Sequence, residues 1–432
     1  MFKYLSILAS IIVTSFYLFP FDFAFLPGIN TKLVMAIISI PLLMSDVAAK
    51  RSGHIRKDFL IVSLFALSVS FTSLFAVIYN NTNDYCYVTY IISMMVWLGG
   101  AYTLIRMLKW VHGRVSVNLL FNYLFAVCVI QCLIAVAISR VPVIENFVSS
   151  FYSGYKDLKD FADGRLYGVG CAFDVAGMRM SAIEIIFGCL IYDITRRHKN
   201  RSWIIGLYYI GFVIIAVVGN MIARSTVIGL IFALFIIFYS SSIHKDRISS
   251  LMRKWMFWIL ALGILFCIFA YHYDQSFRMD IRFAFEGFFS LAESGKWEVH
   301  SNDILMTMYR FPESLKTWIV GDGYFMGTIN DPYYTGIDYK GYYMSTDVGY
   351  LRFIYYSGVI GLGAFVLFMF KVASVCKKRI PKYKLVFTTL LILQLVIWLK
   401  VASDIFSIFA LFLVVSWLQD NGTDNVLEAK KA

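Results

Sequence analysis

Charged residues are scarce in this chain. Asp, Glu, Lys and Arg make up only 15% of its 432 residues, whereas ordinary soluble domains carry about 25%. Hydrophobic residues make up 59%, aromatic residues 18%, and the mean hydropathy is +0.71. An apolar excess of this size over the whole length means that most of the surface contacts lipid. The composition excludes a soluble globular protein and indicates an integral membrane protein.

The sequence also lacks the patterns that hold a metal ion or a disulfide framework. Its 7 cysteines lie mostly inside apolar stretches, and the pair Cys128 and Cys132 fits packing on one face of a membrane helix. There is no Asp-x-Asp pair, of the kind with which metal-dependent glycosyltransferases bind their ion. We therefore expect neither a metal site nor a cofactor.

The net charge of +12 does not indicate a nucleic-acid partner. A basic binding face gathers Lys and Arg on a soluble domain, and no soluble stretch of this chain is long enough to form one. The basic residues lie between the apolar stretches instead. We expect the chain to contact membrane lipid and to bind no nucleic acid.

Apolar stretches long enough to span a bilayer as helices recur along the chain. A basic residue precedes the first stretch and no clear cleavage site follows it, so we interpret it as an uncleaved helix. About twelve transmembrane helices in a single transmembrane domain, residues 1–432, follow from this pattern. The predicted spans are 4–23, 33–48, 59–79, 86–105, 117–139, 177–194, 203–219, 225–241, 255–271, 349–370, 384–399 and 402–418.

The loops decide the orientation of this polytopic all-α protein. With a cytoplasmic N-terminus, the larger share of the 39 Lys and Arg falls in the inner loops, which is the distribution that orients membrane proteins. The stretch 203–241 must break near Arg224, because one helix of that length would be about 58 Å long against a hydrocarbon core of about 30 Å. Both termini are then cytoplasmic.

Two longer segments face the outer side in this topology. The first is residues 140–176, and the second, residues 272–348, holds most of the remaining polar residues. An apolar stripe predicts a helix over residues 301–320, with Asn302 or Asp303 as its cap. Pro312 is a candidate position for a break in this helix, because a proline inside a helix removes one hydrogen bond. We expect this large loop to be partly helical and to lie along the membrane surface as a partial lid.

Four arginines in the outer segments are candidates for binding an anion: Arg165, Arg224, Arg282 and Arg310. Arg224 is the most informative, because it lies in a short turn between two membrane helices, where a charge needs a partner or a water-filled cavity. A guanidinium group pairs well with phosphate oxygens. The alternative for each arginine is contact with lipid headgroups.

Most outer carboxylates are expected to be solvated, but Asp347 lies two residues before a predicted membrane helix. A carboxylate at that depth is placed to take a proton from an attacking hydroxyl group. His300 is the second candidate base, although a loop histidine is usually a solvated surface residue. Glu184, inside a predicted membrane helix, is expected to be functional or to pair with Arg179 or Arg224, because an unpaired charge is costly there.

Tyrosines cluster before Asp347, and their rings suit either bound sugars or a membrane-interface belt. The candidates for sugar contacts are Tyr339, Tyr343 and Tyr350. Gly321, Gly323 and Gly327 loosely imitate a phosphate-binding loop, but they neither follow a strand nor open a helix. The glycines are therefore a weak signal for phosphate binding.

The chain resembles the O-antigen polymerase and O-antigen ligase superfamily in three segments, which occur in this order: IIAVVGNMIARSTVIGLI, then SLKTWIVGDGYFMG in a large outer loop, then STDVGYLRFIYYSGVIGLGAF. The topology agrees over the whole chain, while the motifs cover a small part of it. Ligases of this superfamily carry a His-Asn pair where this chain has Ser345, Thr346, Asp347 and Val348. The resemblance is therefore closest to O-antigen polymerases of the Wzy type.

The resemblance implies a metal-independent glycosyltransferase of the membrane-embedded, GT-C-like kind in the bacterial inner membrane. Its substrates would be oligosaccharides carried on undecaprenyl pyrophosphate, and a chain-length regulator and a flippase would be its membrane partners. The four outer arginines would hold the pyrophosphate and offset the charge that develops as it leaves. Asp347 would be the first choice as base and His300 the second.

A transporter, such as a flippase for lipid-linked oligosaccharides, is the alternative from another class. Transporters are often built from internal repeats and place polar residues in the middle of the membrane. This chain has no internal repeat, and its polar residues concentrate on one outer face. That distribution favours an enzyme at the membrane surface.

Overall fold

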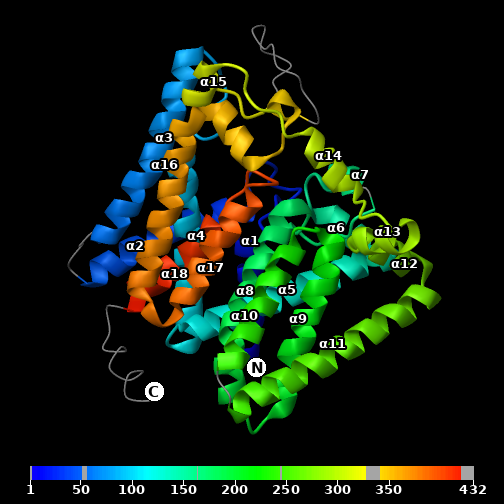
Figure 1. The fold of residues 1–432 in the computed structure, drawn as a ribbon. Helices are drawn as coiled ribbons and strands as arrows, with labels where there is room; N and C mark the ends of the chain where they lie inside the picture. The colour runs from blue at the N-terminus through cyan, green and yellow to red at the C-terminus, as the bar shows by residue number, and fades with distance from the viewer. Residues whose placement is uncertain (1, 51–55, 163, 244–245, 327–340, 420–432) are drawn as a thin grey trace. The chain divides into compact units, whose positions relative to one another are not determined.

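The computed structural model describes residues 2–50, 56–162, 164–243, 246–326 and 341–419. This part of the chain is helical throughout (Figure 1) and contains no β-strand. Isolated β-bridges join Asp22 to Asn30, Phe23 to Tyr152 and Met326 to Tyr342. The predicted all-α fold class is confirmed over the described residues.

Within these residues, nine helices are long and apolar enough to cross a membrane. Two shorter apolar helices, α1 and α18, and the short helix α17 lie near the ends of the chain. Each predicted span overlaps one of these helices, and nine of the spans correspond to the long ones, so a multi-pass membrane protein is supported and the count of about twelve spans stays a prediction. The long helices are α2 (Thr31–Lys50), α3 (Lys57–Asn80), α4 (Tyr90–His112), α5 (Val117–Arg140), α8 (Phe173–Arg197), α9 (Ser202–Ile222), α10 (Thr226–Ile243), α11 (Arg247–Tyr273) and α16 (Gly349–Arg379), and the shorter ones are α1 (Phe2–Leu18), α17 (Lys384–Ile397) and α18 (Phe406–Gln419).

The helices begin and end where the sequence offers capping groups or interrupts the apolar run. The Ser116 side chain accepts a hydrogen bond from the Leu119 amide and starts α5, and Asp246 starts α11 in the same way. The predicted break in the stretch 203–241 is confirmed, because α9 ends at Ile222 and α10 begins at Thr226. Arg224 lies in the turn between them.

The two outer segments contain most of the short helices: α6 (Pro142–Phe151), α7 (Tyr155–Ala162), α12 (Gln275–Ala284), α13 (Glu286–Ser294), α14 (His300–Thr307), α15 (Leu315–Ile319) and the 3-10 turn η1 (Tyr343–Ser345); a second 3-10 turn, η2 (Pro381–Tyr383), precedes α17. The helix expected over residues 301–320 is divided into α14 and α15, with Pro312 between them. Its expected caps were wrong. Val299 precedes α14 without a capping side chain, and Ser314 caps α15 by accepting a hydrogen bond from the Thr317 amide.

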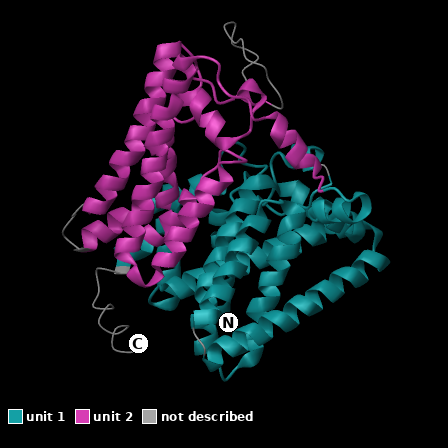
Figure 2. Ribbon diagram, viewed as in Figure 1, with its two compact units in different colours: residues 1–39, 100–296, 414–432 teal, residues 40–99, 297–413 magenta. Residues whose placement is uncertain are grey.

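The helices group into two compact units (Figure 2). Unit 1 comprises residues 1–39, 100–296 and 414–432, and unit 2 comprises residues 40–99 and 297–413, apart from the positions left undescribed. The prediction of a single transmembrane domain over residues 1–432 stays a prediction.

Each unit is organised around one helix. In unit 1, α8 packs against α5, α9, α10 and α11, and its contact with α10 is close because small residues line it. A Cβ atom on Gly229 of α10 would lie 2.2 Å from the Ser181 Cα atom of α8. In unit 2, α16 packs along α3 and also contacts α15 and α17. These two central helices carry or adjoin the candidate site residues.

Candidate functional site

Arg224 occupies the turn between α9 and α10 in unit 1. Its Nη2 atom lies 2.6 Å from Oε2 of Glu286, and its Nε atom donates a hydrogen bond of 2.9 Å to the Phe283 carbonyl oxygen. The guanidinium group also lies over the Phe283 ring, 4.0 Å from the ring centre. Phe283 belongs to α12, which packs against α9, and Glu286 is the first residue of α13. Arg224 is therefore fixed by the junction of α12 and α13.

Arg165 reaches the same ring from another segment. The Leu166 amide donates a hydrogen bond of 3.1 Å to the Met221 carbonyl oxygen, which holds the chain after α7 against the end of α9. From there the Arg165 guanidinium lies 5.5 Å from the centre of the Phe283 ring. Its Nε atom is buried and has no hydrogen-bond partner among the described residues. Arg165, Arg224, Phe283 and Glu286 form a group that we call the arginine cluster.

The arginine cluster carries more positive than negative charge. It contains two guanidinium groups and one carboxylate, and the Arg224 and Glu286 side chains are 17% and 32% exposed. Burial lowers the pKa of Arg224, the positive charge of Arg165 lowers it further, and the Glu286 carboxylate raises it. An additional anion beside Arg165 would relieve the repulsion between the two arginines. This arrangement is suited to binding an anion with several oxygen atoms.

Arg282 has other partners, although it adjoins Phe283 in the sequence. Its Nη2 atom lies 2.8 Å from Oε1 of Glu293, and its Nη1 atom donates a hydrogen bond of 3.2 Å to the Tyr271 hydroxyl. The guanidinium lies over the Phe289 ring at 5.0 Å. These contacts raise the pKa of Arg282, the Tyr271 hydrogen bond most strongly. Arg282 holds α12, α13 and the end of α11 together.

Asp347 lies at the start of α16 in unit 2 and forms an ion pair that the sequence did not indicate. Its Oδ1 atom lies 3.0 Å from Nη1 of Arg352, and the two side chains are 20% and 7% exposed. Arg352 Nη2 also donates a hydrogen bond of 3.1 Å to the Phe325 carbonyl oxygen. The guanidinium lies over the rings of Phe325, at 3.7 Å, and Tyr342, at 4.5 Å. The Asp347 carboxylate is thus held by a buried, immobilised cation.

The backbone before Asp347 is strained. Met344 and Ser345 both have positive φ angles, 55° and 54°, which are uncommon for residues with a side chain. The Ser345 amide donates a hydrogen bond of 3.0 Å to the Tyr342 carbonyl oxygen and closes the turn. Strained backbone persists only where surrounding contacts enforce it, and it often occurs at functional sites.

The tyrosines of this region are packed into unit 2. The Tyr343 ring stacks on Tyr324 at 5.2 Å, and its hydroxyl donates to Asp322 at 3.3 Å. The Tyr350 hydroxyl donates a hydrogen bond of 2.8 Å to the Leu395 carbonyl oxygen. Tyr339, the third candidate for a sugar contact, lies outside the described residues. Tyr343 and Tyr350 are both engaged within the protein, and their proposed contact with sugar stays a prediction.

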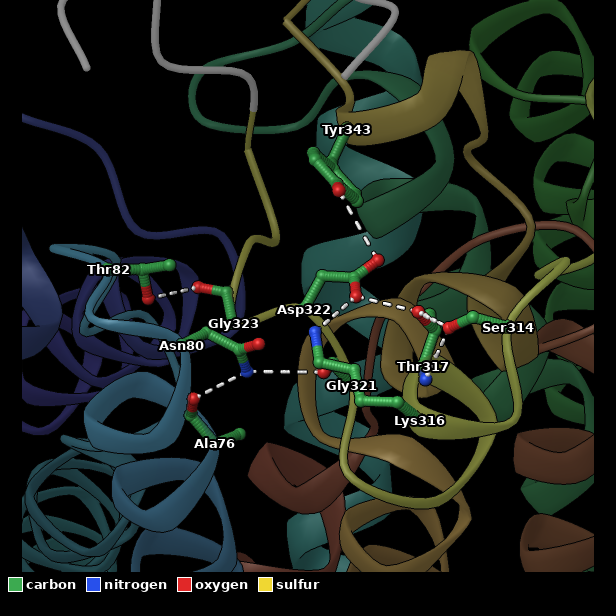
Figure 3. Close-up of polar contacts among 10 residues, drawn as sticks. All are labelled: Ala76, Asn80, Thr82, Ser314, Lys316, Thr317, Gly321, Asp322, Gly323 and Tyr343. Carbon is green, nitrogen blue, oxygen red and sulfur yellow. Dashed lines mark hydrogen bonds and ion pairs between the residues drawn. The ribbon is translucent and has the colours of Figure 1, made fainter. Parts of the chain in front are cut away.

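Asp322 is the centre of a hydrogen-bond network between α15 and the neighbouring loops (Figure 3). Its Oδ1 atom accepts hydrogen bonds from Lys316 Nζ at 2.8 Å and from the Thr317 hydroxyl at 2.7 Å. The carbonyl oxygens of the two flanking glycines, Gly321 and Gly323, accept hydrogen bonds from side chains of α3 and of the loop that follows it (Figure 3). Asn80 donates to Gly321 at 3.1 Å, and Thr82 donates to Gly323 at 2.9 Å.

The same loop caps a break inside α16. Ser357 and Gly358 have non-helical dihedral angles, so the carbonyl groups just before them lose their normal helical partners. The amides of Asp322 and Gly323 donate to the carbonyl oxygens of Tyr355 and Tyr356, at 2.5 Å and 3.1 Å. These amides are therefore not available for a phosphate group. The weak phosphate-loop signal of Gly321 and Gly323 reflects a structural cap, and Gly327 lies outside the described residues.

The two remaining candidates, Arg310 and His300, lie in the α14 region of unit 2. Both are exposed. The Arg310 carbonyl oxygen accepts a hydrogen bond of 3.3 Å from the Tyr355 hydroxyl, and its Nε atom donates to the Thr307 carbonyl oxygen at 3.4 Å. His300 is the first residue of α14, which packs on the buried cluster around Val348, Leu351 and Tyr355. Both residues therefore belong to the same packed region as the start of α16.

The structure brings together some predicted site residues and not others. Arg165 and Arg224 share the arginine cluster in unit 1, whereas Arg282 is paired with Glu293. Arg310, His300 and Asp347 lie in unit 2. The expected convergence of all four arginines on one ligand stays a prediction.

Glu184 does not pair as expected. It is fully buried in α8, and neither carboxyl oxygen has a hydrogen-bond partner among the described residues. Arg179 Nη1 instead donates a hydrogen bond of 2.7 Å to the Leu18 carbonyl oxygen, and Arg224 pairs with Glu286. The predicted pairing with either arginine is wrong, because each arginine turns toward a partner outside α8.

Several residues of these sites could not be recognised from the sequence. Glu286 was expected to be solvated like the other loop carboxylates, and nothing in the sequence links it to Arg224. Asp84, in the loop before α4, accepts hydrogen bonds from the Phe325 and Met326 amides at 2.8 Å and 3.0 Å. Arg352 offered one signal, since it is a charged residue in an apolar helix that begins two residues after Asp347.

The described residues contain no group of three His, Cys, Asp or Glu side chains that could hold a metal ion. In comparisons with known proteins, no protein family, no curated protein sequence and no solved structure matches this chain.

Proposed function

We propose that this protein is a polymerase that joins oligosaccharide repeat units carried on undecaprenyl pyrophosphate into O-antigen or a related surface polysaccharide. In this proposal the chain crosses the bacterial inner membrane about twelve times and has a GT-C-like architecture. Both termini are cytoplasmic, and the large helical loop is periplasmic. A chain-length regulator and a flippase are its membrane partners.

The observation that carries the proposal is the arginine cluster. Two guanidinium groups approach one aromatic ring at the end of membrane helices, and a single carboxylate balances them. A pyrophosphate leaving group gains negative charge as its bond to the sugar breaks, and fixed guanidinium groups stabilise that charge. Arg165 and Arg224 would do so, and Arg310 and Arg282 are the further candidates.

The start of α16 supplies the second chemical group. In the proposed reaction, a terminal sugar hydroxyl of one repeat unit attacks the anomeric carbon of the glycan on a second carrier. The new glycosidic bond forms as the bond to pyrophosphate breaks, and the leaving group takes the electron pair. Asp347 takes the hydroxyl proton, with His300 as the second candidate, and Arg352 holds the Asp347 carboxylate in place.

A deletion strain tests this function, because the three related activities leave different products. Without a polymerase, single repeat units are still flipped and ligated. We expect the surface glycan to change from a ladder to one repeat unit per acceptor, as seen by gel electrophoresis of the surface glycan. Restoring the gene should restore the ladder.

Two other outcomes would point to the alternatives. An acceptor that carries no unit, with long polymer left on the lipid carrier, would indicate an O-antigen ligase. Single units trapped on the inner face of the membrane would indicate a flippase. A normal ladder in the deletion strain would exclude the polymerase.

A further inference from the structure

We propose that Glu286 is a built-in counterion, which occupies the anion position on Arg224 and is displaced when a diphosphate group binds to the arginine cluster. This inference rests on the proposed function for its natural ligand, the pyrophosphate of a lipid carrier. It assigns Glu286 a role that the reaction itself does not require.

The contact between Glu286 and Arg224 has the geometry of a bound anion. The carboxylate oxygen lies 2.6 Å from Nη2, while Nε of the same guanidinium is taken by the Phe283 carbonyl oxygen. The Arg224 and Glu286 side chains are 17% and 32% exposed, so solvent reaches part of the pair, although the contacting oxygen of Glu286 is itself buried. Breaking a partly buried ion pair is costly, so an anion replaces Glu286 only if it gains contacts that the carboxylate does not make.

Arg165 provides the reason for exchange. Its guanidinium contacts only the faces of the Phe173 and Phe283 rings in the described part of the chain, and its Nε atom has no partner there. The Glu286 carboxylate bonds to Arg224. A diphosphate has two separated groups of oxygen atoms and can contact both arginines, so it neutralises the charge that Glu286 leaves uncompensated.

Glu286 is also placed where it can be released. It is the first residue of α13, and a negative charge is stabilised near the N-terminus of a helix. When the carboxylate leaves Arg224, the N-terminal turn of α13 still favours its charge. While it remains on Arg224, it competes with any added anion, so an anion that contacts Arg224 alone gains little by replacing it.

The test measures binding of inorganic pyrophosphate to the purified full-length protein in detergent by calorimetry. In Glu286→Gln the side chain keeps its size but no longer competes for Arg224, so we expect pyrophosphate to bind roughly tenfold tighter than to the unchanged protein. Glu286→Ala should give the same direction. Thermal unfolding of each variant verifies that it is folded.

Glu145→Gln is the matched control. It removes one negative charge from the same unit, at a side chain that is 27% exposed and paired with Lys159. We expect its affinity for pyrophosphate to be unchanged. An equal gain in this control would show a general effect of net charge and would overturn the inference.

Other results also overturn it. Unchanged or weaker binding in folded Glu286→Gln and Glu286→Ala would do so, as would the absence of binding in every variant. Binding that persists fully in Arg224→Gln would place the anion elsewhere. These outcomes are separate from the test of the polymerase: a normal glycan ladder in the deletion strain would refute the proposed function and leave a displaceable Glu286 standing.

Discussion

Arg165 and Arg224 lie against one phenylalanine ring, and the geometry of their side chains matters as much as their charge. A guanidinium group contacts a ring face and binds oxygen atoms in its plane at the same time, which an ammonium group cannot do. Arg224 uses both properties, since it covers Phe283 and binds Glu286. A lysine at this position would keep the charge but could not make both contacts at once.

We therefore predict that Arg224→Lys lowers polymerisation by about 100-fold or more while the protein still accumulates in the membrane. Polymer length and amount on the cell surface are the measurement. Arg278→Lys is the control, because Arg278 lies in the same loop and donates to backbone carbonyl oxygens at the end of α11. Full activity in Arg224→Lys would assign Arg224 to lipid contact.

The second prediction concerns Asp347. Asp347→Asn is nearly isosteric and cannot accept a proton, so we expect activity to fall by about 100-fold or more and the cells to show one repeat unit per acceptor. Protein level should stay normal. A normal ladder in this variant would move the base to His300 or another loop carboxylate, and His300→Gln is the variant that decides between them.

The third prediction concerns Arg352. It separates the role of Arg352 in positioning the Asp347 carboxylate from the effect of its positive charge. Arg352→Lys keeps a positive charge near Asp347 but loses the second hydrogen bond to Phe325 and the stacking between two rings. We expect the maximal rate to fall more than the affinity for substrate, because the carboxylate is less well held. A change in affinity alone would contradict the positioning role.

At the scale of elements, the break in α16 is the feature that no sequence pattern predicted. The stretch 349–370 is apolar apart from Arg352 and a few hydroxyl groups, and it was expected to be one continuous helix. The break depends on Gly358, whose φ of +65° disfavours any other residue, and on amides supplied by a loop distant in the sequence. Local periodicity contains no information about such a partner.

We predict that Gly358→Ala disrupts the break in α16 and its contact with the loop that caps it. A Cβ atom there would lie 2.0 Å from the Ile319 carbonyl oxygen, in a backbone conformation that is already unfavourable for alanine. The loss of stability should be about 2 kcal/mol or more, seen as a lower melting temperature of the purified protein. Gly363→Ala, in the same helix with no atom within 4 Å of its Cβ position, is the control and should have little effect.

The helices themselves were predictable because length and hydropathy determine them. The partners of Asp84 and Glu286 were not, since each depends on a contact between segments far apart in the chain. The carboxylates of the large loop show this most clearly: Asp280, Glu286 and Glu293 were expected to be solvated, and each pairs with an arginine. The charge of each carboxylate did not indicate which arginine it would contact.

At the scale of the whole molecule, the orientation follows from the distribution of Lys and Arg and can be tested by labelling. Single cysteines replace Ser202 and Ser242, at the ends of α9 and α10, and Ser149 and Ser294, in α6 and α13; all four serines are exposed. An impermeant thiol reagent should label the first two from the cytoplasm and the last two from the outer side. Labelling of Ser202 and Ser294 positions from one side would refute the topology.

Only some of the native cysteines have to be replaced before this labelling. Cys86 is exposed, and Cys189 and Cys267 are partly exposed, so these three are replaced first. The other four cysteines are buried and remain in place. The protein without any added cysteine is the control, and it should give no label from either side.

The bonds from Asn80 and Thr82 to the loop at Gly321 and Gly323 each join residues that are 241 positions apart. Chains are synthesised at about 5 to 20 residues per second, so tens of seconds pass between the synthesis of α3 and the synthesis of its partners in the loop. The largest segment of unit 1 is synthesised in that interval, because residues 100–296 lie between the two segments of unit 2. Unit 2 is therefore completed late, by closure of a very long loop, and a chain that stops at residue 296 has no means of completing it.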